Sequence, residues 1–158
     1  MSISSEPEKR AGDELAAGLV SLERAIMNPL VPGELVAWLK SVQQAATVVR
    51  PLLHERIEQD HQKMLQEIVR QDIELASRVE QMREEAAAIL LQFAGWEASV
   101  KEFAEVAADV EPREEKFQSH LQGIVQSGID FIVATRKQEA AIHTWHGEAF
   151  LRDRGGNG

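Results

Sequence analysis

Histidine and carboxylate side chains are the groups in this sequence best suited to chemistry, because the chain has five His and no Cys. His54, Glu58 and His61 follow one another at intervals of four and three residues. On an α-helix this spacing places the three side chains on one face, where imidazole and carboxylate groups can share an iron or zinc ion. A His and a Glu four residues apart are also neighbours on any exposed helix. The sequence leaves both interpretations open, and the local pattern favours the surface pair.

Three further polar residues lie on or beside apolar stripes. Asp60 falls on a stripe, and we expect it to be hydrated or paired rather than a metal ligand, because an unpaired buried charge is costly. His143 and His146 lie on either side of Trp145. We expect the Trp145 ring to pack in the core and both His side chains to stay solvated.

Composition and charge narrow the function classes. Lys plus Arg number 17 and Asp plus Glu number 26, so the formal net charge is −9. This acidity argues against nucleic-acid binding, which needs clustered cations. The longest fully apolar run, residues 86–91, is far shorter than the roughly 20 residues of a membrane span. The N-terminal residues lack the apolar segment of a secretory signal. We therefore expect a cytoplasmic protein with neither membrane nor nucleic-acid partners.

Apolar residues at alternating intervals of three and four predict an all-α protein. The expected helices span residues 13–27, 33–70, 72–110 and 113–151, with flexible tails at 1–12 and 152–158. Pro51 should kink the second helix or divide it in two. Long helices joined by short connections favour an up-down four-helix bundle over residues 13–151, with a short first helix and three long ones. A dimeric coiled coil is the alternative, and the Pro-containing joints count against it.

The last two expected helices carry the most regular stripes, which predict their core-facing residues. The first of these stripes is Ala76, Val79, Met82, Ala86, Ile89, Phe93, Trp96, Val100, Phe103 and Ala107. The second is Phe117, Leu121, Ile124, Gly128, Phe131, Thr135, Gln138, Ile142, Trp145 and Ala149.

Four stretches carry a family resemblance through their order and spacing. They are LVSLERAIMNPLVPGELVAWLKSV, LLHERIEQDH, DIELASRVEQMREEAAAILLQF and FIVATRKQEAAIHTWHGEAFLRDRGG. Together they resemble the bacterial hemerythrin-like (HHE cation-binding) domains over nearly the whole chain. His54 and Glu58 match the family's His-x-x-x-Glu motif. The resemblance implies a four-helix bundle whose interior holds a di-iron centre through several His and two carboxylates.

Three positions depart from the ligand pattern that the resemblance implies. Ala86 stands at the third-helix His position, Gln138 at the fourth-helix His position and Ile142 at the Glu that follows. All three lie on the core-facing stripes. The remaining ligands are too few for two iron ions. We therefore expect a bundle that has lost its di-iron centre, folds without a cofactor and acts as a structural or regulatory protein rather than an enzyme.

The alternative hypothesis retains a metal. His54, Glu58 and His61, joined by His120 or by another chain, would hold one iron or zinc ion in a sensor or storage protein. A homo-oligomer and an unidentified protein partner are compatible with either hypothesis, because the long stripes could continue across an interface.

Overall fold

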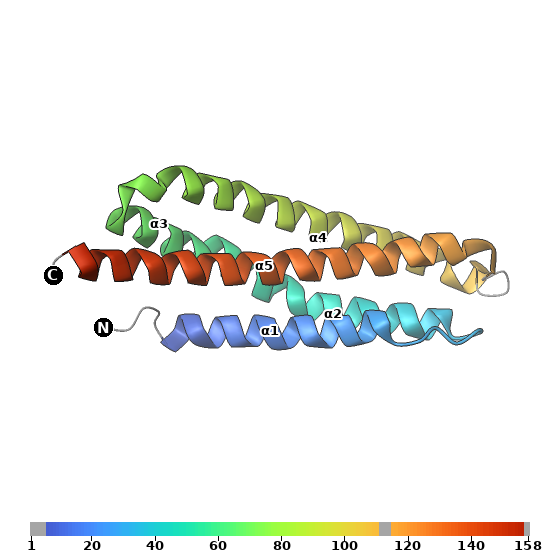
Figure 1. The fold of residues 1–158 in the computed structure, drawn as a ribbon. Helices are drawn as coiled ribbons and strands as arrows, with labels where there is room; N and C mark the ends of the chain where they lie inside the picture. The colour runs from blue at the N-terminus through green and yellow to red at the C-terminus, as the bar shows by residue number, and fades with distance from the viewer. Residues whose placement is uncertain (1–5, 111–114, 157–158) are drawn as a thin grey trace.

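The computed structural model describes residues 6–110 and 115–156, and every element in them is helical (Figure 1). The α-helices are α1 (Glu6–Met27), α2 (Leu35–Glu55), α3 (Gln62–Gln71), α4 (Ala76–Val110) and α5 (Gln118–Gly156). A π-helical segment (Arg56–His61) joins α2 to α3, and a 3-10 turn (Ile73–Leu75) leads into α4. The described part of the chain contains no strand, as the sequence predicts.

Both outer helix boundaries differ from the sequence prediction. The first helix begins at Glu6 rather than at Asp13, and the last continues to Gly156 rather than ending near Leu151. Tertiary contacts explain the early start, since the Glu8 carboxylate pairs with Lys63 of α3 at 2.8 Å. The rest of the expected tails (residues 1–5, 157 and 158) and the start of the last expected helix (residues 111–114) lie outside the described residues.

The helices pack side by side along most of their length (Figure 1). Helix α1 packs against α2 and α5, α2 packs against α4, and α5 also contacts α3 and α4. One apolar core lies between α1, α2, α4 and α5, and a smaller one lies between α3, α4 and α5. Residues of the predicted stripes on α4 and α5 contribute to both cores, so each of these two helices spans both.

The stripe on α4 is confirmed almost completely. Nine of its ten predicted residues are buried, and the tenth, Ala76 at the start of the helix, is exposed. On α5 the predicted residues from Leu121 to Ile142 and Ala149 are buried, whereas Phe117 and Trp145 are half-buried. His146, next to Trp145, is fully buried. The expectation that His146 stays solvated is wrong. Its ring lies 2.7 Å from the Glu67 carboxylate, which offsets the cost of burying the imidazole.

The π-helical segment changes which residues of the second long helix face the core. A π-helical turn holds one residue more than an α-helical turn and so shifts the apolar stripe. The apolar residues at spacing three and four from Leu35 to Ile57 are buried, as are Trp38 and Arg56. His61 then enters the interior, whereas Asp60 on the predicted stripe stays partly exposed. Asp60 is paired instead with Arg56, in agreement with the paired interpretation of this carboxylate. The departure from α-helical geometry begins five residues after Pro51 and not at the proline itself.

Gly128 on α5 offers a test of how tightly the larger core is packed. A Cβ at this position would lie 2.7 Å from Ile26 Cδ1 and 3.1 Å from the Trp96 ring, whereas a Cβ at Gly123 would meet nothing within 4 Å. We expect Gly128→Ala to lower the free energy of unfolding by about 1 kcal/mol, because overpacking outweighs the better helix propensity of Ala. Gly123→Ala is the control and should raise it by up to about 1 kcal/mol. Urea denaturation measures both; equal gains in stability would contradict tight packing at Gly128.

Candidate functional site

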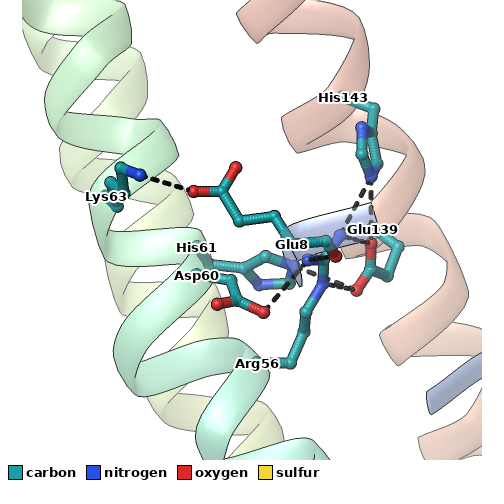
Figure 2. A network of polar contacts seen from close by, with 7 residues as sticks. All are labelled: Glu8, Arg56, Asp60, His61, Lys63, Glu139 and His143. Carbon is teal, nitrogen blue, oxygen red and sulfur yellow. Dashed lines mark hydrogen bonds and ion pairs between the residues drawn. The ribbon is translucent and has the colours of Figure 1, made fainter. Parts of the chain in front are cut away.

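A buried arginine is the centre of the main polar cluster in the protein. Arg56 opens the π-helical segment, and its side chain is 1% exposed. Its Nε donates to Glu139 Oε1 at 2.6 Å and its Nη2 to Glu139 Oε2 at 3.1 Å, so that the two side chains form a bidentate pair (Figure 2). Its Nη1 donates to Asp60 Oδ2 at 3.1 Å and to the Glu8 carbonyl at 2.8 Å. The second Nη2 hydrogen faces His143 Nε2 at 3.1 Å, and this nitrogen accepts it only when it carries no proton.

Glu139 of α5 lies on the opposite side of the cluster and contacts Arg56 and two histidines. His61 Nε2 lies 3.0 Å from Glu139 Oε1, and His143 Nε2 lies 3.4 Å from Oε2 (Figure 2). Burial alone would raise the pKa of Glu139, but hydrogen bonds from His143, His61 and Arg56 outweigh it and hold this pKa far below its ordinary value. Burial would likewise lower the pKa of Arg56, but Glu139 and Asp60 outweigh it and raise this pKa. Glu139 is therefore a carboxylate and Arg56 a cation.

The two histidines of the cluster differ in what their rings can do. A carboxylate only accepts hydrogen bonds, so His61 Nε2 carries the proton that it donates to Glu139. His61 Nδ1 is buried and has no hydrogen-bond partner among the described residues. His143 is half-exposed, and its Nε2 faces both Arg56 and Glu139. Without a proton on Nε2, His143 accepts from Arg56; with one, it donates to Glu139.

A second, smaller pair lies farther along α5. His146 Nε2 donates to Glu67 Oε2 at 2.7 Å, and Nδ1 of the same ring has no partner among the described side chains. The His146 ring also lies 4.8 Å from the Phe150 ring, centroid to centroid. This pair joins α3 to α5 and fixes which face α5 presents to the smaller core.

The sequence-predicted metal residues are only partly brought together. His54 Nδ1 lies 3.1 Å from Glu58 Oε1, and both side chains are about half exposed, at 45% and 55%. His61 lies in the interior against Glu139 and not on the face of that pair, because the π-helical turn rotates it inward. The expectation that the three residues share one face is wrong for His61. The ring of His120 stacks on Phe103 with centroids 4.8 Å apart.

The interior does not fit the di-iron group that the family resemblance implies. Ala86, Gln138 and Ile142 are all buried, as the stripes predict, and Gln138 Nε2 donates to the Met82 carbonyl. Within the described residues, no group of three or more His, Asp or Glu side chains is arranged to hold a metal ion. The carboxylate of Glu139 already faces a fixed guanidinium cation, which would repel a metal cation placed beside it.

The sequence prediction did not single out Arg56. The sequence contains a weak signal that Arg56 is buried and paired. Arg56 directly precedes Ile57, which is on the apolar stripe, and stands four residues before Asp60. Arginine in a helix is normally exposed, so the pattern alone favours a surface ion pair. Its burial depends on Glu139, which is 83 residues away in the sequence.

Comparisons of the chain with family models, with curated proteins and with solved structures find no match. None of the helices in the described residues combines the length and apolar character that crossing a membrane requires.

Proposed function

We propose that the chain is a hemerythrin-like, up-down four-helix bundle that has lost its di-iron centre and acts as a non-catalytic structural or regulatory protein. The observation that carries this proposal is the buried Arg56. Its guanidinium supplies the positive charge among interior carboxylates that a metal would otherwise supply. A cytoplasmic location and the lack of nucleic-acid partners belong to the same proposal.

The directions of the helices support the up-down arrangement. Contacts between α4 and α5 pair Trp96 with Ile124 and Met82 with Gln138, so these two helices run in opposite directions. Contacts of α3 and its π-helical turn with α5 pair His61 with Glu139 and Glu67 with His146, so these segments run in the same direction.

Helix α1 completes the alternation. The Trp38 indole of α2 donates to the Asn28 carbonyl at 3.0 Å, next to the joint between the helices. At the other end of α1, the Glu8 carbonyl accepts from Arg56. Helices α1 and α2 therefore run in opposite directions, as an up-down bundle requires.

Metal analysis tests the proposed function. For protein purified from iron- and zinc-supplemented culture, we expect no metal above background and the same melting temperature with and without a chelator. A structural or catalytic metal would stabilise the fold and make it sensitive to the chelator. His54→Ala is the control variant. About two irons per chain would overturn the proposal. About one metal ion per chain, lost in His54→Ala, would favour the iron or zinc sensor or storage site around His54 and Glu58.

A further inference from the structure

A groove follows the outer surface between α4 and α5, which pack side by side (Figure 1). Two adjoining pockets of about 520 Å³ and 380 Å³ form it, and Gln92 lines both. Apolar side chains of Ile89, Trp96 and Ile124 contribute to its lining. Leu91 at its edge is 76% exposed, more than any other large apolar side chain of the described residues. Contiguous apolar surface of this kind is typical of a face that another protein covers.

Two glycines in this groove have no role in packing within the chain. Gly95 of α4 and Gly123 of α5 both line it, and a Cβ at either position would meet nothing within 4 Å. Glycine inside a helix is destabilising relative to alanine. It does allow the backbone of another molecule to approach closely. The two glycines therefore fit a groove that a second molecule enters.

The two edges of the groove carry opposite charges. The α4 edge carries Glu85 and Glu102, which are separated by alternating intervals of three and four residues and so share one helix face. The α5 edge carries Lys116 and Lys137 at the same kind of spacing. All four side chains are exposed, and none pairs with another charged group in the described part of the chain. Their charges are therefore available to a partner molecule.

The register of α4 on α5 places each acidic group level with a basic one. The two side-chain hydrogen bonds that join these antiparallel helices fix this register. Counted from those bonds, Glu85 lies within one helical turn of the level of Lys137, and Glu102 lies within one turn of the level of Lys116. Both acid–base pairs thus face each other across the groove at its two ends.

This pattern of charges is complementary to itself. A second copy turned by half a rotation about an axis parallel to the helices would lay its α4 over α5 of the first copy at the same level. Glu85 would then meet Lys137, Glu102 would meet Lys116, and each pair would form twice. A half rotation about an axis across the helices would instead set Glu85 against Glu102 and Lys116 against Lys137. The repulsion of like charges disfavours that second arrangement.

We propose that the chain forms a homodimer through this groove, with α4 of each copy lying over α5 of the other. Leu91 packs into the groove of the second copy. The Gln92 amide lies level with Asp130, the one carboxylate of the α5 lining, and donates to it across the interface. The contact is narrow and its rim is charged, so the dimer is weak and dilute protein is monomeric. The inference goes beyond the proposed function, and metal content is measured separately, so failures of the two are distinguishable.

Sedimentation equilibrium from about 1 to 500 µM chain tests the dimer. We expect the mass to rise reversibly from that of a monomer to that of a dimer, with a dissociation constant between about 10 and 100 µM. Because exposed charges are screened by salt, the dissociation constant should rise severalfold in about 1 M NaCl. A monomer mass up to about 500 µM would overturn the proposal.

Charge reversal tests which edges meet. Lys116→Glu with Lys137→Glu makes both edges acidic, and Glu85→Lys with Glu102→Lys makes both basic. Each double variant alone should dimerise at least about tenfold more weakly than the natural protein. An equimolar mixture of the two should form a heterodimer about as tight as the natural dimer, because every facing pair is then of opposite sign. A mixture that stays monomeric would overturn the pairing.

Neutral substitutions test which face is covered. Leu91→Gln and Gly95→Gln should each weaken the dimer at least about tenfold, by removing the apolar contact and by filling the groove. Val48→Gln on α2 is the control for the first, since Val48 is 58% exposed. Gly147→Gln is the control for the second, since a Cβ there also meets nothing within 4 Å. Unchanged melting temperatures show that the variants fold. Natural affinity in both Leu91→Gln and Gly95→Gln would overturn the assignment of this face.

Disulfide trapping distinguishes the two orientations, because the chain has no Cys of its own. A mixture of Glu85→Cys and Lys137→Cys chains should give the mixed disulfide dimer under mild oxidation. A mixture of Glu85→Cys and Glu102→Cys chains should give at most about a tenth of that yield, because a disulfide requires the two Cα atoms to lie within about 7 Å. The reverse order of yields would overturn the proposed orientation.

Discussion

Replacing Arg56 with Met is expected to lower the free energy of unfolding by about 3–5 kcal/mol, which is the typical cost of removing one partner from a buried ion pair. Met retains an unbranched chain but no charge. The variant would leave Glu139 and Asp60 without the cation that both face in the interior. It would also leave the Glu8 carbonyl without its donor from Arg56. Urea denaturation at neutral pH, fitted with a common slope, measures the loss.

Arg50→Met is the matched control for this variant. Arg50 is half-exposed and pairs with Glu97 across the surface between α2 and α4. Exposed ion pairs of this kind contribute between zero and about 1 kcal/mol. If Arg56→Met and Arg50→Met lower the free energy of unfolding equally, the buried cluster contributes no more to stability than a surface pair.

The double variant Arg56→Met with Glu139→Leu separates the pair from its surroundings. Replacing both members of a buried pair by apolar residues is often nearly neutral, because no charge remains unpaired. We expect the double variant to be less destabilised than the sum of the two single variants by about 2 kcal/mol. Strict additivity would show that Arg56 and Glu139 do not act as a unit.

Much of the helical pattern is local and could be predicted from the sequence. Residues at spacing three and four define the buried faces of α4 and most of α5, because an α-helix repeats every 3.6 residues. The prediction fails where a distant partner decides the conformation. The burial of Arg56 depends on Glu139 of α5, and the burial of His146 depends on Glu67 of α3. Neither partner is visible in the local spacing.

The same reasoning explains the outcome for the candidate site. His54 and Glu58 form the contact that the i, i+4 spacing predicts. His61 does not join them, because the seven-residue interval from His54 includes the π-helical turn. The burial of Ala86 and Ile142 could be predicted, because these positions lie on regular α-helical stripes. The burial of a cation in the interior could not be predicted, because it depends on Glu139, which lies 83 residues from Arg56 in the sequence.

Stability should fall as the pH drops below about 4.5, the ordinary pKa of a Glu side chain. In the folded protein the pKa of Glu139 is held far below this value, so the unfolded chain binds more protons at acidic pH than the folded chain does. The stabilisation is therefore fully present above about pH 4.5 and is lost as the pH falls toward the folded pKa. Each pH unit in this range costs at most about 1.4 kcal/mol for this one group.

Glu139→Gln isolates this contribution from the other acidic groups. The variant should be less stable than the natural protein by about 3 kcal/mol at neutral pH, because the buried Arg56 loses its bidentate partner. Its stability should fall less steeply with acid, so the difference between the two proteins should narrow steadily from about pH 4.5 to pH 2.5. Glu102→Gln, an exposed position on α4, is the control and should follow the natural protein throughout. Urea denaturation at each pH measures both curves. A difference between Glu139→Gln and the natural protein that stays constant with pH would show that proton binding at Glu139 is not linked to folding.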